Sequence, residues 1–309
     1  MPLIRITDYH HATGWKSDEN ARALECCRAL EAGNILFFDR PPFEFPAADR
    51  EWLLTQKQTD SRHHKNISYR PLQDVVRGYE AASPDDTRRM HEVMRRFSQS
   101  VTQMLTRVLT VYDRGWKMDY ASFRPLQEQG RDLPMNRRND LLHCDAFPTR
   151  PTHGGRILRV FVNLNPNEHR VWLTGEPFDK LAPRMAEAAG LRDLVAKAQS
   201  PVRKVKRALG GLTKLIGGKA ANHSTHDLFM LHFHDWLKAN EAYQKSEHER
   251  HEFPPNACWM VLTDGVPHAA LAGQYALEQT YILPPNILVA PEKSPLRVLE
   301  ALAGCTLTD

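Results

Sequence analysis

Two short segments, far apart in the chain, contain residue types that can hold a catalytic metal. Leu141 to Asp145 reads LLHCD. Residues two apart in a strand point to the same face, so His143 and Asp145 would present an imidazole and a carboxylate side by side. The later stretch TDGVPH offers a second imidazole at His268. Two histidines and one carboxylate leave coordination positions open, which suits Fe(II) binding a co-substrate and O₂ together, although zinc and manganese would also accept these ligand types.

A second histidine pair lies in the pattern LFMLHFHDWLKANEAYQ. The chain has 15 histidines, so an HxD pair by itself is a weak indication of a metal site. His232 and His234 fall in a helical pattern, and residues two apart on a helix point to nearly opposite sides. We therefore interpret them as packing or surface histidines that do not share an ion.

An Fe(II) oxygenase of this type also needs an anchor for the distal carboxylate of 2-oxoglutarate, which a bidentate arginine provides well. The strand expected after His268 has Glu278 and no Lys or Arg. We therefore expect the anchor at Arg159, on the strand after HxD, where Asn163 shares its face. Arg124, just upstream, is a further candidate for the co-substrate or for an acidic substrate. A surface ion pair is the alternative interpretation for each arginine.

The elements that must position these residues follow from the hydrophobic pattern. Helices are predicted over 17–32 and 85–112, and a short buried strand over 34–38. Short strands separated by Gly and Pro turns are expected over 118–125, 137–145, 155–166, 169–177, 258–271 and 275–283. The pattern indicates an α+β fold with a jelly-roll or barrel core from residues 115–179 and 253–292, and with N-terminal helices. Residues 180–245 read as a helical insertion within a single domain, 1–309.

Composition narrows the class of protein. The 309 residues include five cysteines without CxxC spacing, which disfavours a disulfide framework or a thiolate zinc site and favours a reducing compartment. The sequence has no apolar run of the roughly 20 residues that a membrane span needs. The first residues do not read as a signal peptide, so the cytoplasm is the expected location.

A basic, amphipathic segment lies within the helical insertion. No acidic residue occurs between Asp193 and Asp227, although the net charge of the whole chain is only +4. Apolar residues recur at helical spacing opposite most of the charges, a pattern typical of a helix lying in an anionic membrane surface. We expect membrane contacts within 197–219, from Arg203, Lys204, Lys206, Arg207 and Lys214. Packing on the domain is the alternative, and nucleic acid is disfavoured because the segment lacks aromatic residues for base stacking.

Three long strings of the sequence resemble the Kdo hydroxylases. They are HCDAFPTRPTHGGRILRVFVNLNP, FMLHFHDWLKANEAYQ and FPPNACWMVLTDGVPHAALAGQYALEQTYIL. Members of this family are Fe(II)/2-oxoglutarate oxygenases that hydroxylate the 3-deoxy-D-manno-octulosonic acid (Kdo) sugar of lipopolysaccharide. The resemblance implies a double-stranded β-helix core, iron ligands at His143, Asp145 and His268, and use of 2-oxoglutarate and O₂. It also implies hydroxylation at C3 of a Kdo residue on a lipid A precursor, giving the sugar acid Ko.

The implied substrate, Kdo-lipid A, is an anionic glycolipid, which agrees with the basic segment. Arg137, Arg138 and Arg150 flank HxD and are candidate contacts for its carboxylate or phosphate groups. The expected location is peripheral, on the cytoplasmic face of the inner membrane of a Gram-negative-type bacterium. The sequence does not indicate an oligomeric state. The alternatives are a 2-oxoglutarate oxygenase of another substrate, a cupin-type metal protein acting on a sugar acid, and a membrane adaptor whose HxD is incidental.

Overall fold

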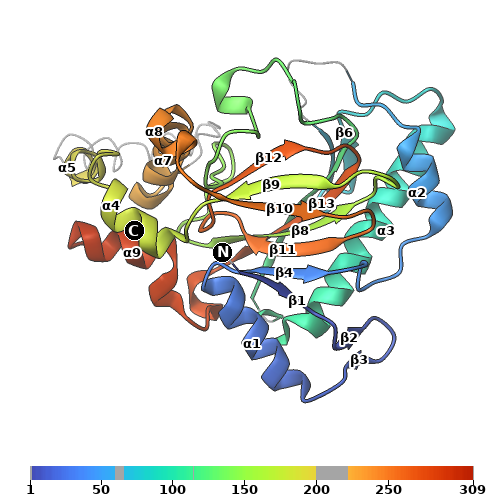
Figure 1. The fold of residues 1–309 in the computed structure, drawn as a ribbon, viewed down its shortest axis with the longest axis horizontal. Coiled ribbons are helices and arrows are strands. Elements are labelled where there is room, and N and C mark those ends of the chain that lie inside the picture. Colours follow the sequence, from blue (N-terminus) through green and yellow to red (C-terminus); the bar gives the residue numbers. More distant parts are fainter. Residues whose placement is uncertain (1, 60–65, 114, 200–221, 309) are drawn as a thin grey trace, which may run out of the picture.

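The structure is a computed structural model that describes residues 2–59, 66–113, 115–199 and 222–308. It is an α+β fold in which a large sheet and a small sheet lie in the middle, with helices around them (Figure 1). The large sheet has the spatial order β1 (Leu3–Arg5), β4 (Ile35–Phe38), β11 (Cys258–Leu262), β8 (Arg156–Asn163), β13 (Ala276–Leu283), β7 (Lys117–Arg124), β5 (Ile67–Arg70) and β6 (Val75–Arg77). The small sheet has the order β10 (Glu249–Phe253), β9 (Arg170–Thr174) and β12 (His268–Ala272). A separate hairpin joins β2 (Tyr9–His10) and β3 (Gly14–Trp15).

The helices form two groups along the chain (Figure 1). The N-terminal group is α1 (Glu19–Glu31), α2 (Ala47–Leu54) and α3 (Pro84–Val108), followed by the short η1 (Thr110–Tyr112). The second group lies at the other end of the sheets and consists of α4 (Phe178–Met185), α5 (Leu191–Gln199), α7 (Thr225–Ala239), α8 (Glu241–Lys245) and α9 (Pro295–Ala303). Short 3-10 turns occur at η2 (Met135–Arg137), η4 (Pro285–Ile287) and η5 (Pro291–Lys293).

The two faces of β8 show how alternation along a strand builds the site. Leu158, Val160 and Val162 belong to the apolar core that includes the buried face of α3. Arg159 and Phe161 point the other way, toward the small sheet. There Phe161 contacts Trp172 of β9 edge to face, with ring centroids 4.8 Å apart. The same strand therefore completes the core on one face and lines the space between the two sheets on the other.

Most of the predicted elements are confirmed, with shifted ends. The helices predicted over 17–32 and 85–112 are α1 and α3, and the strand predicted over 34–38 is β4. The strand predicted over 137–145 is wrong, because this segment has only a 3-10 turn and an isolated bridge at His143. The predicted core ranges also omit the N-terminal strands of the large sheet, which are β1, β4, β5 and β6.

A buried ion pair fixes the turn between β11 and β12, which leads to His268. Arg156 donates from Nε to Oδ2 of Asp264 at 2.6 Å, and the other oxygen of Asp264 accepts from the backbone of Ile157 at 2.9 Å. Both charged side chains are almost fully buried. A side chain at Gly265 would collide with the guanidinium of Arg156 and would have to displace it from its bond to Asp264. The pair thus holds the end of β8 against the turn that positions a metal ligand.

Replacing Asp264 by Ala is expected to lower the free energy of unfolding by about 3–5 kcal/mol, because it leaves the Arg156 guanidinium buried without its carboxylate. Urea unfolding followed by circular dichroism measures this change. The double variant Arg156→Met/Asp264→Ala should be more stable than the single variant, since it also removes the uncompensated charge. A double variant no more stable than the single one would contradict this account of the turn.

Candidate metal centre and its cavity

The three predicted metal ligands lie together. His143 and His268 form a two-residue antiparallel bridge, with their backbone N–H groups donating to each other's carbonyls at 3.1 and 3.0 Å. The backbone N–H of Asp145 donates to the carbonyl of Thr263 at 2.9 Å. One ligand atom from each of the three residues lies within 4.8 Å of the others. Main-chain hydrogen bonds, rather than a regular strand at 137–145, therefore place the imidazoles and the carboxylate side by side.

The orientation of both imidazoles is fixed by the main chain. Nδ1 of His143 donates to the carbonyl of Leu141 at 2.7 Å, and Nδ1 of His268 donates to the carbonyl of Val266 at 2.9 Å. A carbonyl can only accept, so in both rings the proton is on Nδ1 and the lone pair is on Nε2. These Nε2 atoms lie 3.8 and 3.9 Å from the Asp145 carboxylate oxygens. Both lone pairs are thus available to one ion beside Asp145.

The electrostatics keep the ligands in the protonation states that a metal requires. Burial is the main cause that lowers the pKa of His143 and of His268 below the ordinary histidine value. For Asp145, burial favours the neutral acid, but Arg159 and the two histidines outweigh it and hold its pKa well below the usual range. Neutral imidazoles and an ionised carboxylate are the forms that coordinate metals.

One buried oxygen shows that the residues fit a metal ion. Oδ2 of Asp145 is buried and accepts no hydrogen bond from any group in the described part of the chain, although Nε of Arg159 lies 3.2 Å from it. Leaving a buried carboxylate oxygen without a donor is costly unless a cation occupies the site. With three protein ligands grouped on one side, an ion there would have open positions toward the cavity, as non-haem Fe(II) centres do.

A cavity of about 650 Å³ opens beside the ligands, and all three line it. Its walls come from β7, β8 and β13 of the large sheet, from Trp172 and Ala270 of the small sheet, and from α7. The basic side chains that line it are Arg124, Arg150, Arg159, Arg170 and Lys238. This is enough space for a co-substrate and a sugar-sized group, and its basic lining suits anionic ligands.

Arg159 and Arg124 both reach the cavity beside the metal ligands. Nε of Arg159 lies 3.2 Å from Oδ2 of Asp145 and 3.4 Å from Oε1 of Glu278. Arg124 donates from Nε to Oε2 of Glu278 at 3.0 Å. Burial would raise the pKa of Glu278, but the two arginines outweigh it and lower that pKa. Glu278 on β13 therefore lies between two guanidiniums that come from the neighbouring strands β7 and β8.

The remaining predicted arginines and Asn163 have different surroundings. Arg150 lines the cavity, donates to Asp119 at 3.0 Å, and stacks on Tyr120 with its guanidinium 4.1 Å from the ring centroid. Arg137 and Arg138 are not in the cavity lining, and Arg138 pairs with Asp140.

The prediction that Asn163 binds the co-substrate needs correction. Its side-chain amide donates to the carbonyls of Glu168, Phe253 and Pro254, at the far end of β8 and away from the cavity lining. The five predicted membrane contacts, Arg203, Lys204, Lys206, Arg207 and Lys214, lie outside the described residues.

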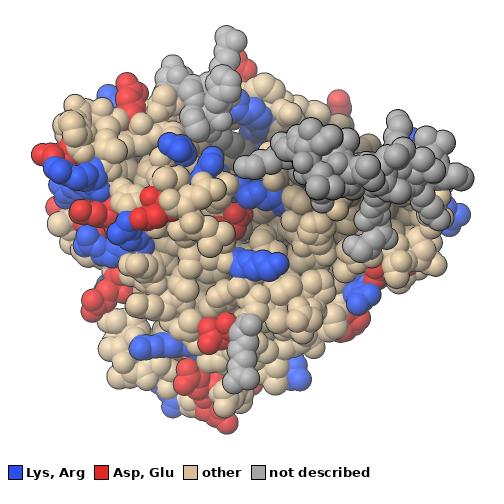
Figure 2. Space-filling model, turned by 180° about the vertical axis from the view of Figure 1, so that it is seen from behind, with Lys and Arg blue, Asp and Glu red and all other residues tan. Residues whose placement is uncertain are grey.

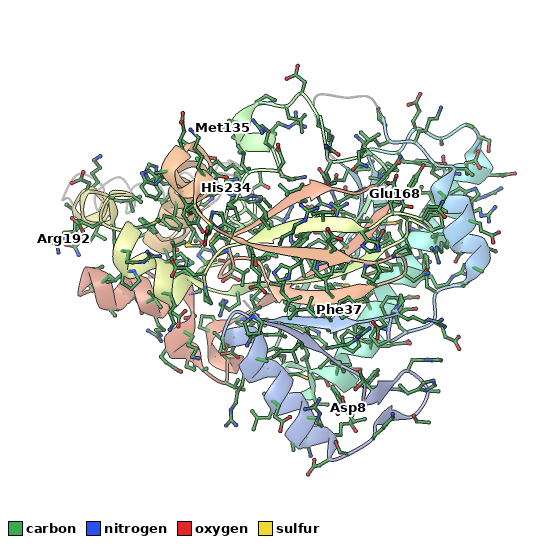
Figure 3. The ribbon with its side chains drawn as sticks, in the orientation of Figure 1. Asp8, Phe37, Met135, Glu168, Arg192 and His234 are labelled. Carbon is green, nitrogen blue, oxygen red and sulfur yellow. The ribbon has the colours of Figure 1, made fainter. Side chains whose placement is uncertain are left out.

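Helix α7 brings two cavity residues that the sequence analysis did not assign to the site. His234 lines the cavity and donates from Nδ1 to the carbonyl of Cys144 at 2.8 Å, with its ring 4.7 Å from that of His143 (Figure 3). Lys238, one turn later, lines the same cavity. His232 is exposed and His234 packs on His143, which agrees with the interpretation of the two as surface or packing histidines. The sequence did not predict that His234 lines the cavity. The i, i+4 spacing of His234 and Lys238 places both side chains on one face of the helix, and this was the feature of the sequence that could have indicated a shared site.

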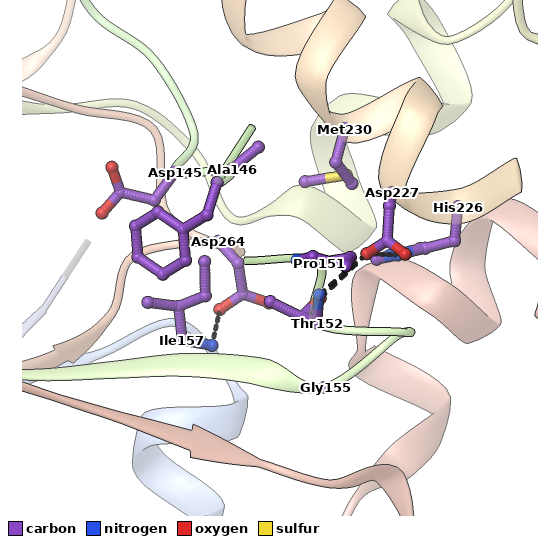
Figure 4. A pocket seen from close by; sticks show the side chains of 11 residues that line it. Asp145, Ala146, Pro151, Thr152, Gly155, Ile157, His226, Asp227, Met230 and Asp264 are labelled. Atoms are coloured by element: carbon purple, nitrogen blue, oxygen red, sulfur yellow. Dashed lines mark hydrogen bonds and ion pairs between the residues drawn. The ribbon is translucent and has the colours of Figure 1, made fainter. Parts of the chain in front are cut away.

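The start of α7 is tied to the loop that follows the HxD segment. Oδ1 of Asp227 accepts from the backbone N–H groups of Thr152 and His153, both at 3.0 Å. Figure 4 shows Asp227 and Thr152 among the residues around a small cavity, with the Asp145 carboxylate pointing away from it. The hydrogen bonds hold the helix that bears His234 against the loop that bears two of the metal ligands.

Comparisons with known proteins identify the family of the chain. A family model described as 3-deoxy-D-manno-oct-2-ulosonic acid (Kdo) hydroxylase matches residues 14–306. Three solved structures of the Kdo hydroxylase KdoO, a non-haem Fe(II) α-ketoglutarate dependent dioxygenase, are each 31% identical to the chain, and the matches cover 100% of it and 98% of theirs. Their TM-scores are 0.80 for the complex with α-ketoglutarate and Fe(III), 0.82 for the cobalt(II) complex and 0.82 for the apo form.

No curated protein sequence matches the chain. The family match nevertheless spans almost all of its length, and the metal ligands lie within the matched residues. The chain belongs to the Kdo hydroxylase family.

Proposed function

We propose that the protein hydroxylates C3 of the Kdo sugar on Kdo-lipid A, giving Ko, with Fe(II), 2-oxoglutarate and O₂. The observation that carries this proposal is the buried group of two neutral imidazoles and one ionised carboxylate, with Oδ2 of Asp145 lacking a hydrogen bond, beside a basic cavity. Membership of the Kdo hydroxylase family supports the sugar acid as substrate. When bound, Fe(II) supplies the oxidative chemistry by which O₂ and 2-oxoglutarate are consumed.

The fold proposed for this chemistry is a double-stranded β-helix formed by the two facing sheets. Antiparallel pairing runs through β10, β9 and β12 on one side and through β11, β8, β13 and β7 on the other. The aromatic contacts between Phe161 and Trp172 pack the sheets against each other near the cavity. Rigid strands on both sides suit a site whose ligands must keep fixed positions.

For the co-substrate we propose Arg159 as the main anchor, with Arg124 beside it. Both guanidiniums line the cavity and are held by Glu278, whose carboxylate limits their movement. A preorganised guanidinium loses little conformational entropy when it binds a carboxylate in bidentate fashion. Its closeness to Asp145 would place a bound dicarboxylate next to the metal ligands.

For the substrate, Arg150 is the predicted contact whose position fits best. It lines the cavity, and its guanidinium is held between Tyr120 and Phe147, with ring centroids at 4.1 and 4.4 Å. Arg137 and Arg138 lie on or next to η2, outside the cavity lining, where they would contact parts of the glycolipid that extend beyond it.

Mass spectrometry of Kdo-lipid A incubated with the protein tests the function. We expect a mass gain of one oxygen atom that depends on Fe(II) and 2-oxoglutarate and is matched by succinate formation. Asp145→Ala should abolish the gain and weaken Fe(II) binding in equilibrium dialysis, because it removes one of three ligands. Asp85→Ala, at an exposed position on α3, is the matched control and should behave as wild type. Full oxygen transfer by Asp145→Ala would exclude this metal centre.

Arg159→Met should raise the apparent KM for 2-oxoglutarate by about 10- to 100-fold, since a charge-assisted hydrogen bond contributes about 1.5–3 kcal/mol. Initial rates of succinate formation at varied 2-oxoglutarate measure the effect. Arg192→Met on α5 removes an exposed arginine and should leave this KM unchanged. An unchanged KM in Arg159→Met as well would move the anchor to another residue.

We also propose that the protein acts at an anionic membrane surface, through the basic residues of 197–219. The support is the run of basic residues at helical spacing in the sequence and the lipid-linked sugar proposed as substrate. Among the described helices, none is long and apolar enough to cross a membrane. On the face shown in Figure 2 the described basic and acidic side chains are intermixed.

Reversing the charge at Lys204, Lys206 and Arg207 to Glu should weaken binding to anionic vesicles by roughly 100-fold or more, since each basic residue near such a surface contributes about 1 kcal/mol. Vesicle co-sedimentation measures the binding. The control with the same change in net charge places Glu at Arg88, Arg192 and Lys245, whose side chains are all highly exposed. Equal loss in both variants would show a general charge effect instead of a membrane-facing segment.

A further inference from the structure

The basic residues of the cavity differ in one respect, which is whether a carboxylate neutralises them. Arg159 lies beside Asp145 and Glu278, and Arg124 is paired with Glu278. Arg150 is paired with Asp119, and Arg170 with Glu128. Lys238 is different. No carboxylate oxygen of the described residues lies within 4 Å of its Nζ, the distance that defines an ion pair.

Lys238 is also deeply buried. Its relative exposure is 4%, and the hydrogen bond that the structure shows for Nζ goes to the carbonyl of Asn136, at 3.1 Å. An ammonium group has three N–H donors, and this bond uses one of them. Burial lowers its pKa to about 8, which still leaves the group mainly charged at neutral pH. Asp145, Asp235 and Asp140 favour the charged form from longer range, but none of them pairs directly with the ammonium. A buried cation without an ion-pair partner is costly, and such a cation facing a cavity indicates an anionic ligand.

The position of Lys238 places that ligand close to the reacting centre. His234 lies one helical turn earlier on the same face of α7, and its ring contacts that of the metal ligand His143. One turn corresponds to about 6 Å along the helix axis, a distance that a lysine side chain spans. The arginines proposed for the co-substrate come instead from β7 and β8.

We propose that Lys238 binds the carboxylate of the sugar acid and thereby orients the sugar for hydroxylation. This inference rests on the proposed function. In a 3-deoxy-2-ulosonic acid the carboxylate is attached to C2, the carbon next to the deoxy position, so holding the carboxylate also holds C3. An ammonium on α7 beside His143 would fix the carboxylate at one end of the sugar while C3 faces the metal ligands.

The alternative is that Lys238 only ties α7 to η2. Its bond to the Asn136 carbonyl joins these two elements, which are in contact, and Figure 3 labels His234 on one and Met135 on the other. A purely structural lysine would affect stability when replaced. It would not affect the preference of the protein for an acid over the corresponding amide.

The experiment compares two ligands that differ only in charge at C1, the methyl glycoside of Kdo and its C1 carboxamide. Each is titrated calorimetrically, without O₂, into the full-length protein loaded with Fe(II) and 2-oxoglutarate. Wild type should bind the acid about 10- to 100-fold more tightly than the amide, the range for a hydrogen bond to a charged group. Lys238→Met should bind both ligands with the affinity that wild type has for the amide, and Lys238→Arg should keep part of the preference.

Lys245→Met is the matched control, because Lys245 on α8 is exposed and paired with Glu241. It should retain the full acid preference. Affinity for 2-oxoglutarate should be unchanged in Lys238→Met, which separates a sugar contact from the co-substrate anchor. If Lys238→Met does not fold, Lys238→Gln takes its place, because it keeps a donor for the Asn136 carbonyl. Its affinities for the acid and for the amide are then compared in the same way, and equal affinities are expected.

Two outcomes would overturn the proposal in different ways. A full acid preference in Lys238→Met would show that Lys238 is structural, and would leave the proposed function intact. Failure of wild type to bind either ligand would contradict the proposed function itself, and the carboxylate subsite with it.

Discussion

The backbone bridge between His143 and His268 is the interaction on which the rest of the site depends. It joins two segments that are far apart in the sequence, and the bond from Asp145 to the Thr263 carbonyl extends the same contact to the third ligand. Main-chain bonds also fix both imidazole tautomers. The metal ligands are therefore positioned by peptide groups, which are far less mobile than side chains, and the buried Arg156–Asp264 pair holds the turn from which His268 follows.

Around this framework most buried charges of the cavity are paired, and the ammonium of Lys238 is a positive charge without an ion-pair partner among the described residues. Arginines from both sheets and from the loop before β8 meet Glu278, Asp119, Glu128 and Asp145, which balances much of the buried charge around the cavity. Buried charges persist only when they are paired or meet a ligand. The positive charge on the α7 side is what an acidic substrate would neutralise, so the same electrostatics that keep Asp145 ionised also favour an anion in the cavity.

The sequence predicted the two long N-terminal helices and most of the core strands, because each depends on local spacing. It also predicted three metal ligands, from the HxD spacing and a distant histidine, and the structure brings these three side chains together. It misplaced a strand at 137–145, where the pairing is formed with distant residues and leaves no period-two pattern. It did not place Glu278 or Lys238 at the site, because the sequence does not show which charged side chains face each other across a cavity. Asn163 was misjudged because sharing a face of β8 does not decide which end of the strand lies at the site.

The attachment of α7 has an evolutionary consequence. The predicted metal ligands come from the loop before β8 and from the start of β12, whereas His234 and Lys238 come from α7. This helix contacts that framework through Asp227, through η2, through the bond from His234 to the Cys144 carbonyl and through apolar packing. If Lys238 binds the sugar acid as we propose, catalytic chemistry and substrate choice are encoded in different parts of the chain. Mutations on the Lys238 side of α7 would then change which acid is accepted while the predicted metal ligands are retained, so that new specificities would arise in this fold without a new metal centre.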